Sequence, residues 1–309
     1  LEMEDLAQRS GGTEDSKGIP RIGVMRADVD NLGAAFLAGF PSEYATMTRT
    51  AALSQRLSLF FKHYINDICH GKFSTHFSLF GREKKAARDV HIVYSGGDDI
   101  FLLGAWDDIV ELAVDLRRAF LRFTSGKLHF SAGIGFFKDK CPIAEMARRT
   151  GDLESRAKDL RDADGRLKKD SVALFGAVTE GRSFAEFETH AQVYGWDDFI
   201  DNVCGEKLTF LHENCSFEEG GNGARLNLGK SRLYRLLELL ESGAQIHLAR
   251  FAYTLARLDP GRAAESQEAY GRVRAQFYEW YRSPSHRRQL STAIQLIIYS
   301  IREKGVQNG

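Results

Sequence analysis

Mostly apolar runs alternate with longer periodic stretches over the first 180 residues of the chain. Four runs predict strands, because they are short and bounded by glycine or polar residues: 21–28, 91–94, 100–103 and 128–137. Apolar residues at intervals of three and four predict amphipathic helices at 53–68, at 106–123 and, after Pro142, at 143–160. A short apolar run at 172–175 predicts one further strand.

The order of the main elements is strand–helix–strand–strand–helix–strand, which is the split βαβ arrangement of ferredoxin-like domains. Polymerase palms and nucleotide cyclases share this arrangement, although a fold by itself assigns no activity. We therefore predict an α+β fold whose first domain, residues 20–180, is a ferredoxin-like polymerase/cyclase palm. Its antiparallel βαββαβ sheet is expected to carry its helices on one face.

The two ends of the chain differ from this central pattern. Residues 1–19 are polar and without periodicity, so we expect a linker or tail there. From residue 181 onward four amphipathic stretches dominate: 226–240, 244–258, 265–281 and 287–302. They predict an all-α helical bundle over residues 181–309, and a chain of 309 residues is long enough to bury two cores.

Two adjacent carboxylates lie at a glycine turn between two of the predicted strands. The stretch Tyr94–Asp99 (YSGGDD) has apolar residues on both sides, so Gly96-Gly97 is expected at the tip of a hairpin. An ordinary polar turn has the same composition. Neighbouring anions repel each other, however, and are best tolerated where cations lie between them. Oxygen ligands on a rigid turn suit Mg²⁺, which shares its coordination shell with phosphates.

A third carboxylate comes directly after the first predicted strand. That strand runs into Asp28–Gly33 (DVDNLG), and an apolar segment follows. As an isolated feature Asp28 would be a helix N-cap, and the amides after it would lie where N–H groups and the helix dipole favour phosphate. If the strand lies beside the hairpin, Asp28, Asp98 and Asp99 converge and could hold two ions around a triphosphate. We therefore favour a metal-dependent nucleotide site.

The remaining charged residues change this picture little. Lys158 could reach terminal phosphates as a point charge, although most surface lysines have no such role. Basic clusters at 82–88 and 282–288 are expected to be solvated loop charge, and the formal net charge of zero does not indicate nucleic-acid binding. No apolar run reaches membrane-spanning length and no signal peptide is visible, so we expect a cytoplasmic protein without a membrane partner.

These motifs together resemble a known family. Asp28–Gly33, Ser54–Phe61 and Tyr94–Asp99 look like segments of the large subunit of type III-A (Csm) CRISPR effector complexes, in that family's order, and the likeness extends from about Pro20 to the C-terminus. The resemblance implies a prokaryotic palm that uses ATP and Mg²⁺ (or Mn²⁺) to make cyclic oligoadenylates when target RNA binds. The partners that it implies are other subunits of the effector complex, the guide RNA and the target RNA.

The resemblance also implies roles for individual residues. Asp28, Asp98 and Asp99 are implied to be catalytic metal ligands, and Val29 to add its backbone carbonyl to the metal site. The residues implied to bind the nucleotide are Val29, Asp30, Asn31, Leu32, Ser95, Gly96, Gly97 and Lys158. The family's large subunit normally begins with an HD-type nuclease domain and a first palm. Neither is visible here and the chain does not begin with Met, so we expect the C-terminal half of a longer protein.

Two other functions stay open from the sequence. GGDEF diguanylate cyclases use a similar carboxylate arrangement on GTP, but this chain has Asp99-Ile100 where their motif has Glu-Phe. The non-enzymatic alternative is a scaffold subunit that keeps the acidic hairpin and acts by assembly.

Overall fold

The computed structural model describes residues 2–10, 18–72, 76–81, 87–175, 191–217, 225–241, 245–260 and 264–302. The chain divides into two compact units, which are described separately. The first comprises Leu1–Trp196 with Lys304–Gly309, and the second Asp197–Glu303.

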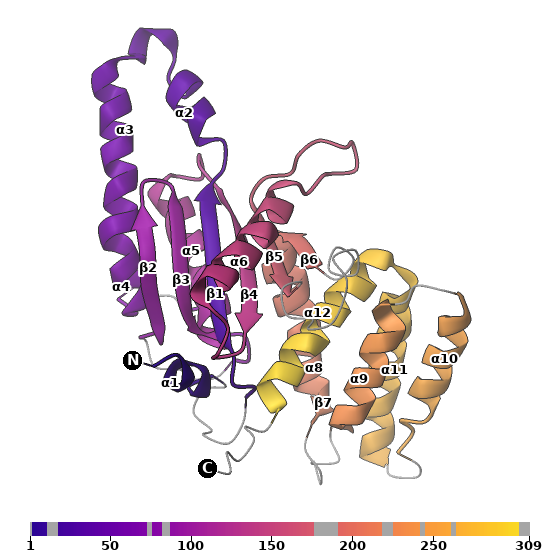
Figure 1. Ribbon diagram of the computed structural model, residues 1–309. Coiled ribbons are helices and arrows are strands. Elements are labelled where there is room, and N and C mark those ends of the chain that lie inside the picture. Colours follow the sequence, from indigo (N-terminus) through magenta and orange to yellow (C-terminus); the bar gives the residue numbers. More distant parts are fainter. Residues whose placement is uncertain are drawn as a thin grey trace. The chain divides into compact units, whose positions relative to one another are not determined.

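The first unit is built on a six-stranded sheet with the order β2-β3-β1-β4-β5-β6 (Figure 1). The strands are β1 (Ile22–Val29), β2 (Val90–Gly96), β3 (Asp99–Ala105), β4 (Phe130–Phe137), β5 (Ser171–Phe175) and β6 (Ala191–Gly195). Neighbouring strands from β2 to β4 run antiparallel, in the order of a ferredoxin-like sheet. The predicted fold class is therefore confirmed. Beyond it, β5 is parallel to β4 and β6 is antiparallel to β5.

The helical segments of this unit lie before and between these strands. They are α1 (Met3–Gln8), α2 (Leu32–Ala38), η1 (Ser42–Tyr44), α3 (Met47–Leu59), η2 (Phe60–Tyr64), α4 (Ile65–Cys69), α5 (Trp106–Phe123) and α6 (Ile143–Lys158). The three predicted palm helices, at 53–68, 106–123 and 143–160, correspond to α3–α4, α5 and α6.

Helices cover both faces of the sheet, not one as predicted. Gly23 of β1 faces α5, because a Cβ atom at Gly23 would lie 2.7 Å from the Cα atom of Trp106. Its neighbours Ile22 and Val24 instead belong to an apolar cluster with Met146 of α6. Successive strand residues point to opposite faces, so α5 and α6 lie on opposite sides of the sheet, and Figure 1 shows α6 in front of it. Strand β1 is buried along most of its length for this reason.

The expectation of a linker or tail over residues 1–19 is wrong for part of that segment. Helix α1 buries Leu6 and Ala7, which are each 2% exposed, in the same apolar cluster as Ile22 and Val24. The predicted domain boundary at residue 180 lies in the segment 176–190, outside the described residues. Strand β6 pairs with β5 beyond that segment, so the first unit extends to Trp196.

Arg88 is buried, which corrects the expectation that the basic stretch 82–88 is solvated; residues 82–86 lie outside the described part. Its guanidinium pairs with the carboxylates of Glu111 and Asp115 on α5, the latter at 2.9 Å. The side chains of these three residues are 2%, 0% and 7% exposed. Asp115 and Glu111 also accept the backbone amides of Phe77 and Leu79 at 2.8 and 2.9 Å. This ion cluster attaches the chain before β2 to α5.

The second unit contains the four predicted helices, which are α9 (Lys230–Glu241), α10 (Gln245–Ala256), α11 (Ala264–Arg282) and α12 (Pro284–Ile301). They follow η3 (Asp198–Leu208), a helix with π-type hydrogen bonds, and α8 (Thr209–Asn214). The unit is not purely α-helical, because β7 (Cys215–Ser216) and β8 (Leu226–Asn227) form a short parallel pair. Within the described residues, the helices are all too short or too polar to cross a membrane.

Candidate functional site

The three carboxylates predicted to converge are brought to one end of the sheet. Strand β1 pairs with β3 so that Asp28 lies opposite Asp99, and the amide of Val29 donates to the carbonyl of Asp98 at 3.0 Å. Figure 1 shows the end of β1 and the β2–β3 turn at the same end of the sheet. The predicted convergence of Asp28 with the hairpin is confirmed.

The turn of the hairpin is formed by Gly97 and Asp98, one residue later than predicted. Gly96 is the last residue of β2 and lies opposite Asp99, the first residue of β3. Gly97 has a φ of +67°, a conformation that favours glycine. The amide of Asp98 donates to the carbonyl of Gly96 at 2.8 Å. Gly97 therefore sets the backbone that places Asp98 beside Asp28.

The local electrostatics opposes ionisation of Asp98. Partial burial raises the pKa of Asp98, and the charges of Asp28 and Asp99 raise it further, while Lys158 partly offsets them. The charge of Asp99, together with a hydrogen bond to it, raises the pKa of the Tyr94 phenol. A site in which carboxylates repel one another attracts cations.

Lys158 is the cation that lies at this site. Its Nζ is 2.5 Å from Oδ2 of Asp28 and 2.8 Å from Oε1 of Glu154, four residues earlier on α6. Burial by itself would lower the pKa of Lys158, but the hydrogen bonds to Asp28 and Glu154 raise it. Glu154 also pairs with Nε of Arg26 at 3.0 Å. Lys158 is thereby brought into contact with a predicted metal ligand, as its assignment to the site requires.

Sequence reasoning missed three neighbours of this site, which are Tyr94, Glu154 and Arg26. Tyr94 was part of the motif but had no role assigned to it. A signal was available for the other two: Arg26 precedes Asp28 by two residues and so shares its face of the strand, and Glu154 lies one helical turn before Lys158. Glu154 holds the lysine and the arginine at once, so it positions Lys158 against Asp28.

The donors at the site fit a hard divalent cation. Among the described residues, no three His, Cys, Asp or Glu side chains are grouped so that together they could hold a metal ion. Mg²⁺ usually takes only one or two carboxylates from a protein and completes its octahedral shell with waters and phosphate oxygens. Asp28, Asp98 and Asp99 supply such oxygens, and the raised pKa of Asp98 marks a place where a cation would relieve repulsion.

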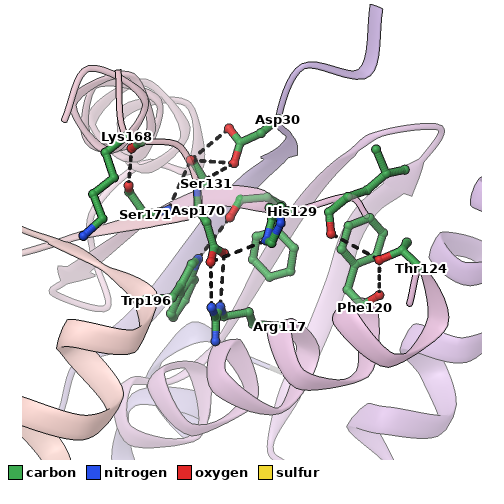
Figure 2. Close-up of polar contacts among 12 residues, drawn as sticks. Asp30, Arg117, Phe120, Thr124, His129, Ser131, Lys168, Asp170, Ser171 and Trp196 are labelled. Atoms are coloured by element: carbon green, nitrogen blue, oxygen red, sulfur yellow. Dashed lines mark hydrogen bonds and ion pairs between the residues drawn. The ribbon is translucent and has the colours of Figure 1, made fainter. Parts of the chain in front are cut away.

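The polar groups of Asp30 are bound to other partners, which corrects the expectation that its amide faces phosphate. Its carboxylate accepts the hydroxyl of Ser131 at 2.9 Å and the backbone amide of Asp170 at 2.9 Å (Figure 2). Its own amide, predicted to face phosphate, donates to the carbonyl of His129 at 2.9 Å. Burial raises the pKa of Asp30 despite these hydrogen bonds. Asp30 therefore joins β1 to β4 and to the start of β5.

Asp170 extends this network on its other side. Its carboxylate accepts Nε and Nη2 of Arg117 on α5, at 3.1 and 2.6 Å, and lies 3.5 Å from Nδ1 of His129 (Figure 2). The paired oxygens of Asp170 and the fork of Arg117 form a bidentate contact, the geometry that gives such pairs their strength. The network holds the end of β1, and with it Asp28, against the neighbouring strands.

The other predicted nucleotide contacts lie around the turn after β1. Asn31 is exposed, with a φ of 55°, and its carbonyl accepts the amide of Ala35 at 3.0 Å. Leu32 is half-buried at the start of α2. The hydroxyl of Ser95 lies 2.5 Å from the carbonyl of Phe61, to which it donates, so it can still accept but has no second proton to give. The assignment of Asn31 and Leu32 to nucleotide binding stays a prediction.

Comparison with known families and proteins gives consistent results. Residues 21–172 match a family model described as Cas10/Cmr2, second palm domain, and residues 217–303 match the second helical domain of the Cmr2 subunit of the CRISPR RNA silencing complex. The chain is 39% identical over 286 residues to the Cas10/Csm1 single-strand-specific deoxyribonuclease (subtype III-A) of Enterococcus italicus, covering 93% of this chain and 31% of that protein. The protein of the same name from Mycobacterium tuberculosis is 40% identical over 312 residues, covering 98% of this chain and 34% of that protein.

Solved structures of similar proteins agree with these matches. The crystal structure of Csm1 in T. onnurineus has a TM-score of 0.69 at 28% identity, covering 97% of this chain and 39% of that chain. A Csm1–Csm4 cassette in complex with cA4 has a TM-score of 0.66 at 28% identity, covering 97% and 38%. A Csm1–Csm4 cassette in complex with one ATP has a TM-score of 0.65 at 30% identity, with the same coverage. The chain spans about a third of the length of the curated relatives that it matches.

Proposed function

The chain belongs to the Cas10/Csm1 family of subtype III-A CRISPR systems, and on that premise we propose that its palm is a metal-dependent nucleotidyltransferase. The proposed reaction converts ATP to cyclic oligoadenylates within a guide-RNA-directed effector complex that target RNA activates. The observation that carries the proposal is the pairing of Asp28 opposite Asp99, with Asp98 at the turn and Lys158 against Asp28.

Similar proteins support the choice of substrate and partner. Csm1–Csm4 cassettes have been solved with ATP, with AMPPNP and with cA4. We therefore propose ATP as the substrate and a Csm4-type subunit as a partner of the longer protein. The relatives are also named deoxyribonucleases. The family resemblance assigns nuclease activity to the HD-type domain, so we do not assign it to residues of this chain.

In the proposed reaction the 3′-hydroxyl of one nucleotide attacks the α-phosphate of another. A 3′–5′ phosphodiester forms, the attacking hydroxyl loses its proton to solvent, the bond between the α- and β-phosphates breaks, and pyrophosphate leaves with the electron pair. Mg²⁺ bound by the carboxylates would lower the pKa of the attacking hydroxyl and neutralise charge on the phosphates. Asp28, Asp98 and Asp99 would hold the ions, with the Val29 carbonyl as a further oxygen ligand.

Lys158 has a separate task in this mechanism. Lys158 contacts both Asp28 and Glu154, so Glu154 would still position its ammonium group if Asp28 were to hold a divalent ion instead. The released ammonium can then pair with an oxygen of the triphosphate as a point charge. Lys158 would thus bind the leaving pyrophosphate, and Glu154 would position it.

Replacement of Lys158 by Met tests this task. We expect ATP affinity in the presence of Mg²⁺ to fall about tenfold, because one charge-assisted hydrogen bond to phosphate is lost. Isothermal titration calorimetry measures the affinity. The matched control is Lys140→Met, an exposed lysine after β4, at the end of the sheet away from Asp28. Equal affinities for wild type, Lys158→Met and Lys140→Met would contradict the role proposed for Lys158.

Product analysis with labelled ATP and GTP tests the proposed function and its alternatives. The chain, alone and assembled with its partner subunits, is incubated with each nucleotide and Mg²⁺. We expect oligoadenylates from ATP and no guanine product. Guanine dinucleotide products would instead identify a diguanylate cyclase, and intact nucleotide in every sample would favour a scaffold.

A further inference from the structure

A cavity of about 250 Å³ lies in the second unit, between α9 and α10, and is separate from the residues of the palm site. Among the described residues its lining is mostly basic and polar and contains no acidic residue: Ser231, Arg232, Arg235, Thr254, Arg257 and Leu258. Three guanidinium groups at one cavity create a strong positive potential. Such a lining suits an anion.

The three arginines have N–H donors that are not used in the hydrogen bonds described for them. Arg232 gives one hydrogen bond from Nη1, to the carbonyl of Asn227 at 2.8 Å. The guanidinium of Arg257 lies 5.9 Å from the centre of the Tyr253 ring. Within the described part of the chain, none of the three arginines forms an ion pair with a carboxylate, and each guanidinium carries five N–H donors.

Thr254 gives an independent indication of a ligand. It is 6% exposed, and its hydroxyl finds no hydrogen-bond partner among the described residues although it is buried. A buried polar group without a partner costs about 1–3 kcal/mol. The cost would be removed by a ligand that accepts this hydroxyl from within the cavity.

The geometry favours a phosphate group over a carboxylate ligand from an acidic protein. Guanidinium forks match the tetrahedral oxygens of phosphate and can bind them in bidentate fashion. The cavity is larger than a lone phosphate needs. Tyr253, next to Thr254 in α10, is 58% exposed and touches Arg257, so its ring is available for stacking with a base.

We infer that the cavity between α9 and α10 binds the phosphate group of a nucleotide, either free or within single-stranded RNA. Arg235 on α9 and Arg257, directly after α10, hold the phosphate, Thr254 donates its hydroxyl, and Tyr253 stacks on the attached base. The inference rests only on residues of the second unit and is independent of the function proposed for the palm.

Binding measured in EDTA tests this site, because removal of divalent ions suppresses the metal-dependent nucleotide site proposed in the palm. The probes are a short fluorescein-labelled single-stranded RNA, followed by fluorescence anisotropy, and ATP, followed by calorimetry. Arg235→Ala and Arg257→Ala are each expected to weaken binding about tenfold, since each removes a charge-assisted contact to phosphate. Both arginines are exposed, so the substitutions are expected to leave the thermal melt unchanged.

The control removes the same charge elsewhere in the unit. Arg274→Ala on α11 takes away an exposed arginine that does not line the cavity, and we expect less than about a twofold change. Thr254→Val, which keeps the shape of the side chain, is expected to weaken binding severalfold.

The two probes separate the two sources of the phosphate. If the arginine variants lose RNA binding and ATP binds weakly to wild type and variants alike, the ligand is an RNA strand. If the arginine variants lose ATP binding, the ligand is a free nucleotide. For RNA, each lost phosphate contact also lowers the slope of log affinity against log salt by about 0.7. Binding of both probes that is unaffected by Arg235→Ala and Arg257→Ala, or reduced equally by Arg274→Ala, would overturn the inference.

Discussion

Replacement of Asp98 and Asp99 together by Asn is expected to abolish oligoadenylate synthesis, with a loss of at least about 100-fold. Removing groups that merely support a metal ligand already costs about 10–100-fold, and these two carboxylates are proposed to be ligands themselves. Asn keeps the size of the side chain but removes the negative charge and replaces one ligand oxygen by an NH₂ group. Product formation from labelled ATP and Mg²⁺, in the assembled complex, is the measurement.

Thermal stability distinguishes this loss from unfolding. The pKa of Asp98 is raised in the folded protein, so its contribution to stability is full below the pKa of the unfolded state and is lost as the pH rises through the folded pKa. At neutral pH the ionised Asp98 therefore destabilises the fold, and Asn should raise the melting temperature while activity disappears. The control is Asp139→Asn, in the turn after β4 at the opposite end of the sheet. Full activity of the variant that lacks both Asp98 and Asp99 would refute their assignment as metal ligands.

Replacement of Arg88 by Met is expected to lower the free energy of unfolding by about 3–5 kcal/mol. The substitution leaves the carboxylates of Glu111 and Asp115, 0% and 7% exposed, without their cation, and an orphaned buried charge is the costly outcome of breaking such a cluster. Urea unfolding at neutral pH measures the change.

Two further variants separate this cause from general damage. Arg148→Met on α6 removes an exposed arginine from two ion pairs, and we expect a change below about 1 kcal/mol. Adding Glu111→Gln to Arg88→Met should recover part of the loss, because it removes one of the orphaned charges. If Arg88→Met lowers the free energy of unfolding no more than Arg148→Met does, the ion cluster contributes little to stability.

Local patterns were sufficient to predict the parts of the site that lie on consecutive residues. The two apolar runs on either side of the glycine turn at Gly97 predict the hairpin. The apolar run before Asp28 predicts the strand beside it. Pairing of Asp28 with Asp99 followed because both lie at strand ends next to turns. The turn was displaced by one residue, since Gly96 and Gly97 are equally suited to it by composition.

Features that depend on tertiary packing were not predictable in the same way. An amphipathic pattern identifies the buried side of α6 but not the face of the sheet against which it packs. Helix α1 has too few residues for periodicity to be read, so Leu6 gave no signal. Arg88 followed a basic loop, and the signal for a buried partner was the pair of acidic residues Glu111 and Asp115, one turn apart among the apolar residues of α5. Asp30 resembled its neighbours in the motif, and the partners of its carboxylate, Ser131 and Asp170, lie 101 and 140 residues further along the chain.

The coupling between Mg²⁺ and ATP affinity tests the central claim most directly. The ATP affinity is measured by titration, once in the presence of Mg²⁺ and once in EDTA, for wild type and for Asp28→Asn. The account predicts that Mg²⁺ tightens ATP binding by wild type at least about tenfold, because the ion bridges the carboxylates and the phosphates, and that Asp28→Asn loses this gain. The same ATP affinity for wild type with and without Mg²⁺ would contradict it.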